Sequence, residues 1–264
     1  MSMIHTENVN DVYSKENVPL WLMSAFKAGF INTVGFLFTG KFVSHVTGFG
    51  TQVGIAVGHE EYFFGAELLI IPCAFIMGGV TTSFILDKDY KNGETPPYWI
   101  VQGLITSLLL VLIFLGLGGF YPENIPFDSD ENYTSLEFFV IGVLCFICGL
   151  KNSLVTWASW GKVKVTHLTG LSTDIGLNLI RTFYKNQSSP RFKEKRFVNI
   201  LRLSTFFCFS SGAALSALMF PPFGFKVLFL PAIISMLMTL ISIWDSQKRL
   251  NRQDQNVEFS PPRL

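Results

Sequence analysis

The chain has 264 residues, of which 49% are hydrophobic and only 15% are charged. Soluble domains carry about 25% charged residues, so this composition disfavours an ordinary soluble enzyme, a disordered chain and a disulfide-stapled secreted domain. The 20 Lys and Arg nearly balance the 19 Asp and Glu, and the formal charge of +1 gives no global positive field for nucleic acid. Composition therefore predicts an all-α integral membrane protein.

The apolar stretches, in chain order, predict the membrane spans. The polar segment 1–18 lacks the basic and apolar parts of a signal peptide. Stretches of about 20 apolar residues can cross a bilayer as helices. Six follow, at residues 20–40, 68–86, 98–120, 138–161, 203–220 and 227–244. Two shorter stretches, 42–58 and 163–180, are rich in Gly, Thr and His, and we expect them to be re-entrant half-helices surrounded by protein or water.

The connections predict the orientation of the chain. If the N-terminus is inside, the outside connections 59–63, 121–134 and 221–225 contain no Lys or Arg, whereas the inside connections contain most of the basic residues. This asymmetry follows the positive-inside rule and predicts that both termini are cytoplasmic. The predicted organisation is a cytoplasmic tail (1–18), a first three-helix repeat (19–120), an external acidic loop (121–134), a second three-helix repeat (135–244) and a cytoplasmic tail (245–264).

The two halves resemble each other in sequence. The first half reads F-K-A-G-F-I-N at 26–32 and V-S-H-V-T-G-F-G-T-Q-V-G at 43–54. The second half reads F-I-C-G-L-K-N at 146–152 and V-T-H-L-T-G-L-S-T-D-I-G at 165–176. Because each half contains three crossings, an odd number, the second copy must enter the membrane from the opposite side. The sequence therefore predicts a 3+3 inverted repeat, an architecture that transporters use to form one central site.

The repeated H-x-T-G motif supplies the candidate site. Thr47 and Thr169 are suitable helix N-caps, so each half-helix is expected to begin there and to direct its N–H groups at an anion, a carboxylate or a carbonyl-rich solute. The candidate substrate-binding residues are His45, Thr47, Gly48, Thr51, His167, Thr169, Gly170, Thr173, Asp174, Asn32 and Asn152.

Several of these residues also have a structural interpretation. His45 and His167 either contact the solute or carry protons, or they brace the break in their own repeat. Asn32 and Asn152 favour interhelical hydrogen bonding.

Asp174 is the main chemical asymmetry within the motif, because the first half has Gln52 there. Its carboxylate either couples a proton or a cation to transport or forms a buried ion pair with Lys27, Lys151 or Arg202.

The cysteines and the remaining motifs point to no chemistry. Cys145 and Cys148 form a C-x-x-C within an apolar stretch, where thiols usually act as small buried hydrophobes. The sequence contains no phosphate loop, zinc-protease motif or nucleophile elbow. We therefore expect no metal, no cofactor and no enzymatic activity.

The motifs also resemble a known family. The stretches G-F-I-N-T-V-G-F (29–36), V-S-H-V-T-G (43–48) and H-L-T-G (167–170) are similar to the YoaK-like family of bacterial six-span membrane proteins. The resemblance extends over about residues 20–244, a length covered in that family by a domain of unknown function. It implies a multi-pass protein of the bacterial inner membrane with a transport role, and it supplies neither a substrate nor catalytic residues.

The function expected from these features is a small-solute transporter or channel with a central site that favours an anionic or polar solute. Two alternatives remain open. A membrane scaffold or regulatory protein would have a solid interior, whereas a membrane-embedded enzyme would gather His45, His167 and Asp174 around one point. The expected partners are the lipid bilayer and a small solute, without nucleic acid, and the Gly-rich helix faces would also permit a homodimer.

Overall fold

The computed structural model describes residues 12–91, 96–119, 135–183 and 190–258, and within these ranges it contains helices and no strands. The predicted all-α class is therefore confirmed for the described part of the chain. The predicted acidic loop at 121–134 lies outside the described residues. The elements are α1 (Asn17–Thr39), α2 (Val46–Gly58), α3 (Tyr62–Lys91), α4 (Tyr98–Leu117), α5 (Ser135–Ala158), α6 (Leu168–Phe183), α7 (Pro190–Phe223), η2 (Gly224–Leu228) and α8 (Phe229–Glu258).

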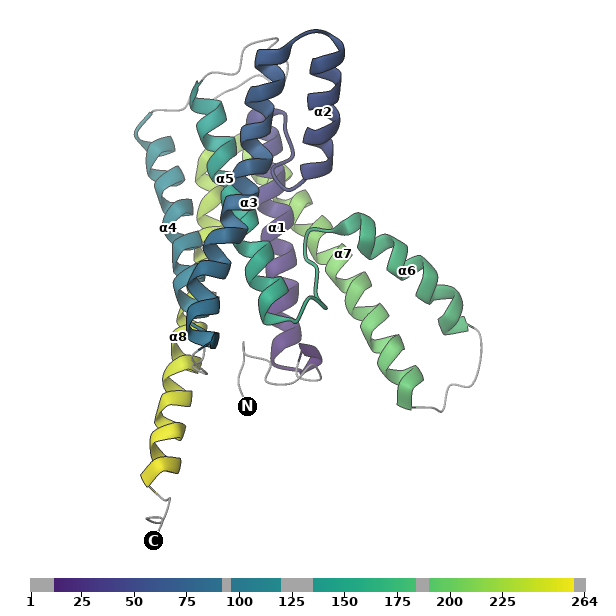
Figure 1. Ribbon diagram of the computed structural model, residues 1–264, viewed down its shortest axis with the longest axis vertical. Coiled ribbons are helices and arrows are strands. Elements are labelled where there is room, and N and C mark those ends of the chain that lie inside the picture. The colour runs from purple at the N-terminus through teal and green to yellow at the C-terminus, as the bar shows by residue number, and fades with distance from the viewer. Residues whose placement is uncertain (1–11, 92–95, 120–134, 184–189, 259–264) are drawn as a thin grey trace.

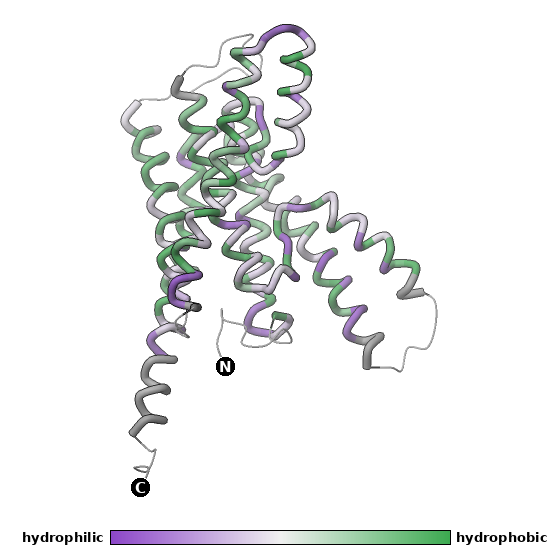
Figure 2. Tube along the Cα trace, viewed as in Figure 1, coloured by the Kyte–Doolittle hydropathy of each residue, from purple (hydrophilic) through white to green (hydrophobic). Residues whose placement is uncertain are grey.

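Five stretches of the described chain are helical, long and apolar enough to span a membrane. Four correspond to α1, α3, α4 and α5, and the fifth, Glu194–Lys248, covers α7, η2 and α8. Hydropathy follows this division, because apolar residues dominate the long helices and hydrophilic residues gather at helix ends and turns (Figure 2).

Within the fifth stretch the chain reverses direction, and α7 and α8 run in opposite senses (Figure 1). The reversal coincides with Pro221, Pro222 and the positive φ of 52° at Gly224. Proline lacks the N–H that an α-helix requires, and glycine tolerates positive φ, so the sequence ends α7 at this point.

The two Gly- and Thr-rich stretches form the short helices α2 and α6. Each follows an apolar helix that ends at a glycine with positive φ, Gly40 (67°) or Gly161 (72°). After each turn an extended segment leads back to the short helix (Figure 1). The helix α2 lies against α3, and α6 lies against α7.

One expectation about these short helices is wrong. Thr47 and Thr169 do not cap them, because α2 begins at Val46 and α6 begins at Leu168. The threonines therefore lie inside the first turn. The residue that precedes α2 is His45, whose side chain makes no capping hydrogen bond.

The helix α1 crosses α7 at two glycines. A Cβ added at Gly29 would overlap the carbonyl oxygen of Phe209, and a Cβ added at Gly212 would overlap the carbonyl oxygen of Phe26. Each glycine thus lets the backbone of the opposite helix approach closely, as small residues do between membrane helices.

The helix α5 crosses α3 in the same way. A Cβ at Gly149 would overlap the carbonyl oxygen of Phe75, and one at Gly78 would overlap that of Phe146. Gly149 is the repeat counterpart of Gly29, so the two crossings are equivalent. The first helix of each half therefore packs against the second long helix of the other half, α1 against α7 and α5 against α3.

Contacts between helices divide the described chain into two groups. One group contains α1, α6, α7 and α8, and the other contains α2, α3, α4 and α5. Each glycine crossing lies within one group, and the groups meet where α1 contacts α5 and, more extensively, where α4 contacts α8. The described ends of the chain lie at the same end of the molecule (Figure 1).

Candidate functional site

The two motif histidines lie at the starts of the short helices and are exposed. The His45 ring meets the edge of the Phe42 ring, with 5.7 Å between the centroids. His167 lies outside the candidate membrane-spanning helices, and partial burial together with the Lys164 ammonium lowers the pKa of this imidazole.

The motif threonines use their hydroxyl groups within their own helices. Thr51 donates to the carbonyl of Thr47 over 3.3 Å, and Thr173 donates to the carbonyl of Thr169 over 3.1 Å. All four threonines are exposed. Their hydroxyls lie on the outer surface of α2 and α6 rather than in the buried centre of the bundle.

The motif glycines have open space beside them. An added Cβ at Gly48 or Gly170 would meet no atom within 4 Å. These glycines therefore do not mediate close helix packing within the described chain, unlike the four glycines at the crossings.

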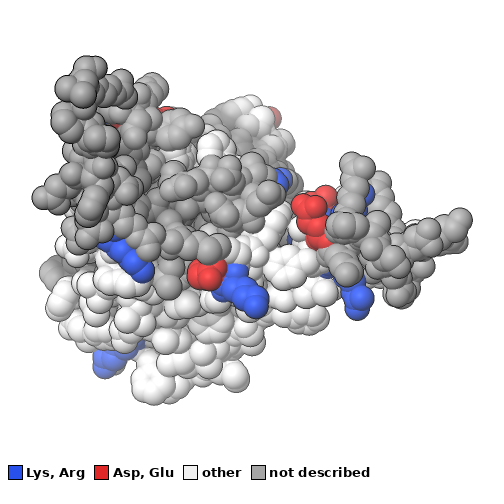
Figure 3. Space-filling model, turned by 90° about the horizontal axis from the view of Figure 1, so that it is seen from below, with Lys and Arg blue, Asp and Glu red and all other residues white. Residues whose placement is uncertain are grey.

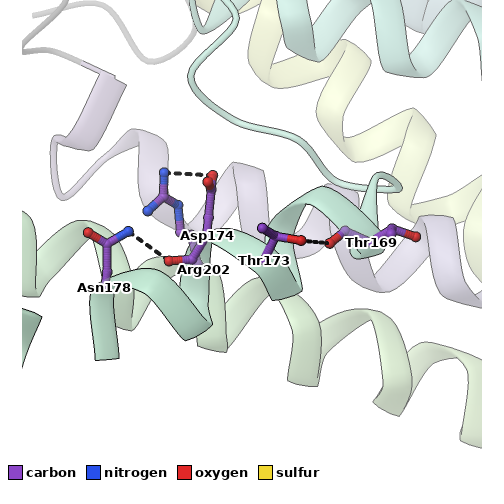
Figure 4. A network of polar contacts seen from close by, with 5 residues as sticks. All are labelled: Thr169, Thr173, Asp174, Asn178 and Arg202. Atoms are coloured by element: carbon purple, nitrogen blue, oxygen red, sulfur yellow. Dashed lines mark hydrogen bonds and ion pairs between the residues drawn. The ribbon is translucent and has the colours of Figure 1, made fainter. Parts of the chain in front are cut away.

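Asp174 pairs with Arg202, and the two side chains lie 2.9 Å apart between α6 and α7 (Figure 4). Of the three partners considered for Asp174, the structure selects Arg202 rather than Lys27 or Lys151. The pair is partly exposed, since the side chains of Arg202 and Asp174 are 26% and 48% exposed.

In the described part of the chain, the corresponding corner of the first half has no ion pair. Gln52 replaces Asp174, and the equivalence of the glycine crossings places Leu68 at the position of Arg202. Leu68 is buried, and the Gln52 Oε1 atom is buried without a hydrogen-bond partner among the described residues.

Asn32 and Asn152 hydrogen-bond to the connecting segment before each short helix and not to another helix, so these bonds are not the interhelical ones expected. The Asn32 Oδ1 accepts hydrogen bonds from the backbone N–H of Ser44 (3.1 Å) and from its hydroxyl (2.9 Å). The Asn152 Nδ2 donates to the hydroxyl of Thr166 over 2.6 Å. Each asparagine thus ties the long helix to the residue before the motif histidine.

Sequence reasoning missed a second polar cluster as a site, at the centre of the bundle. Lys27 on α1 is 0% exposed and Lys151 on α5 is 2% exposed. The two amines are close enough to repel each other electrostatically, and the Cys148 thiol lies near both. The signal was present, because a charged residue within an apolar span is by itself an indication of function.

The two amines differ in their hydrogen bonds. The Lys27 Nζ donates to the hydroxyl of Ser235 on α8 over 3.1 Å, and the Gln102 Nε2 on α4 donates to the same hydroxyl over 2.8 Å. The Lys151 Nζ has no hydrogen-bond partner within the described residues. No carboxylate of the described residues pairs with either amine.

A second polar contact joins α4 to α8. The hydroxyls of Thr106 and Thr239 lie 3.4 Å apart. These buried and half-buried polar side chains lie at or beside the contacts between the two helix groups, on α1, α4, α5 and α8.

Comparison with known proteins gives a family but no described function. The described residues contain no group of three or more His, Cys, Asp or Glu side chains that could hold a metal ion. No curated protein and no solved structure matches the chain at a significant level. The model of one family, described as "Protein of unknown function (DUF1275)", matches residues 20–241, in agreement with the resemblance to YoaK-like membrane proteins. Because the match covers most of the sequence, the chain belongs to this family.

Proposed function

We propose that this protein is a small-solute transporter of the bacterial inner membrane, with both termini in the cytoplasm and a central site that favours an anionic solute. In this proposal α1, α3, α4, α5, α7 and α8 are six crossings of a 3+3 inverted repeat, and α2 and α6 are re-entrant. No covalent step is part of the proposed activity.

The observation that carries the proposal is the buried polar interface between the two helix groups. Burying an ammonium group without a counter-charge costs several kcal/mol, so ionisable residues inside membrane proteins usually serve the solute pathway. Lys27 and Lys151 lie where α1 of one group contacts α5 of the other. Transporters built from inverted repeats bind their solute at such an interface, near the middle of the bilayer.

The packing supports a movement of one group against the other. The glycine crossings lie within the groups, where the backbones of α1 and α7 and of α3 and α5 touch, so each group would move as a unit. The α4–α8 contact between the groups is extensive and includes the polar Gln102–Ser235 and Thr106–Thr239 pairs. Rocking of one group against the other at the contacts between them would open the lysine pair to one side and then to the other.

The charged side chains at one end of the molecule agree with an orientation in which this end lies at the membrane surface. The face that carries both termini displays Lys and Arg side chains together with Asp and Glu among uncharged surface (Figure 3). Charged side chains are costly within hydrocarbon, and this face is therefore suited to the water boundary.

Anion flux into liposomes tests the proposal. Vesicles containing the purified protein are placed in isosmotic potassium salts with valinomycin, so that light scattering reports swelling when the anion enters. We expect faster swelling in salts of small anions such as acetate, phosphate or sulfate than in empty vesicles. Swelling no faster than in empty vesicles for every salt, with folded and inserted protein, would contradict transport of an anion and favour a scaffold.

A further inference from the structure

The two buried lysines occupy different positions in the repeat. In the first half Lys27 precedes Ile31 by one helical turn, and in the second half Ile147 precedes Lys151 by the same distance. Lys27 corresponds to Ile147, and Lys151 corresponds to Ile31 in the repeat. Each half therefore contributes one lysine and one isoleucine, in opposite order, and all four side chains are at most 2% exposed.

The opposite order brings the charges together. The helix α1 begins at the end of the molecule that carries both termini, and α5 runs toward that end (Figure 1). Lysines at equivalent repeat positions would therefore be separated along the bundle axis. The exchange moves Lys151 by one turn, about 6 Å, to the side on which Lys27 lies. The mutual repulsion of the two amines agrees with this placement.

Among the described residues, the surroundings of the two amines provide hydrogen-bond donors and no fixed counter-ion. The Lys27 amine is held by Ser235, which is held in turn by Gln102, whereas the Lys151 amine has no partner within the described residues. A buried donor without an acceptor costs about 1–3 kcal/mol, and an unpaired buried charge costs more. An anion whose oxygens accept from both amines would remove both costs.

We propose that Lys151 and Lys27 together bind one small oxyanion, such as a carboxylate, phosphate or sulfate, between α1 and α5. This inference rests on the proposed transport function and names the class of its solute. Lys151 is the primary ligand because its amine has no partner among the described residues, and Lys27 supplies the second charge from a position fixed by Ser235. The site lies apart from the H-x-T-G residues, whose threonine hydroxyls are exposed.

Binding can be measured without transport. The purified protein in detergent is unfolded by heat in the presence of phosphate, sulfate, acetate or chloride at constant ionic strength and pH. We expect at least one oxyanion to raise the unfolding temperature in a saturable way and chloride to do so less, because a ligand that binds only the folded state stabilises it.

Matched variants locate the site. Lys151→Met keeps the length of the side chain and removes the charge, and we expect it to lose the oxyanion-dependent shift. Ile31→Met, at the repeat-equivalent buried position, is expected to retain the shift. Lys151→Arg keeps the charge and tests the site in a second way, with a reduced but measurable shift.

The outcomes separate the two proposals. No oxyanion response in the unmodified protein, or an unchanged response in Lys151→Met, would overturn the lysine site. Loss of binding in Lys151→Met, with a reduced shift in Lys151→Arg and an unaffected shift in Ile31→Met, would support it. Binding at Lys151 without flux into liposomes would retain the site and contradict transport, whereas flux that persists in Lys151→Met would retain transport and contradict the site.

Discussion

The corner formed by α2 and α3 and the corner formed by α6 and α7 have the same backbone plan but different chemistry. Both corners begin with a positive-φ glycine and an asparagine that holds the turn. The second corner is closed by the Asp174–Arg202 pair, whereas the first has Gln52 and Leu68 at the corresponding positions. The comparison indicates that duplication preserved the residues that set the fold, and that the charged residues diverged between the halves.

The buried Lys27 and Lys151 also differ between the halves, although the backbone around them is equivalent. The glycines at 29 and 149 are equivalent and make equivalent contacts, but the nearby lysines stand at non-equivalent positions. An exact repeat would give the site two-fold symmetric chemistry. Because the two lysines occupy different repeat positions, both positive charges lie toward the same end of the bundle.

The largest expected effect comes from the residues that both halves share. Gly149→Ala places a Cβ against the Phe75 carbonyl, and we expect it to lower the free energy of unfolding by about 3 kcal/mol, as severe overpacking does. Gly29→Ala should cost a similar amount, because the Phe209 carbonyl occupies the same place. Thermal unfolding in detergent measures both.

Gly142 on α5 is the matched control, since an added Cβ there would meet no atom within 4 Å. Gly142→Ala should be neutral or stabilising by about 0.5–1 kcal/mol, because alanine favours the helix. Equal stability of Gly149→Ala and Gly142→Ala would refute the close crossings.

A smaller loss of stability is expected at the two asparagines, which differ in the number of hydrogen bonds that they make to the segment before each short helix. Asn32→Ala removes the acceptor for two hydrogen bonds to Ser44, and we expect a loss of about 2 kcal/mol. Asn152→Ala removes one bond to Thr166 and should cost about 1 kcal/mol. Denaturant titration in detergent compares the two, and a larger loss at Asn152 would reverse the predicted order.

The smallest effect on stability is expected at the Asp174–Arg202 ion pair, whose counterparts in the first half are Gln52 and Leu68. The Asp174–Arg202 pair is partly exposed, so a double-mutant cycle with Asp174→Asn and Arg202→Gln should give a coupling free energy of about 0.2–1 kcal/mol. Gln52→Glu, its counterpart, should gain no such coupling with Leu68. A coupling of several kcal/mol would show that the pair behaves as a buried one.

Much of this fold could be predicted from the sequence because its signals are local. Apolar length predicted where the long helices lie, and the G-K turns preceded the short helices as expected. The first residue of each short helix was predicted less accurately than its existence. The helix α2 begins at Val46 and not after Thr47, because a residue's preference for the capping position does not decide where the helical hydrogen bonds begin.

The long-range features could not be predicted in the same way. Nothing local states that α1 packs against α7 rather than α3, because both partners offer a glycine at the crossing. The choice of Arg202 by Asp174 and the meeting of Lys27 with Lys151 depend on that packing. The sequence shows that Lys27 and Lys151 each lie within an apolar stretch, but it does not show that the two lysines come together.

The most direct test of the central claim, that solute passes as the two helix groups move, is a reversible lock between them. Thr106→Cys and Thr239→Cys replace hydroxyls that lie 3.4 Å apart between α4 and α8, in a background with Cys73→Ser and Cys208→Ser. Oxidation of the double variant should abolish anion-driven swelling of the liposomes, reduction should restore it, and each single cysteine variant should be insensitive to oxidant. Unchanged swelling with the disulfide fully formed would contradict the account.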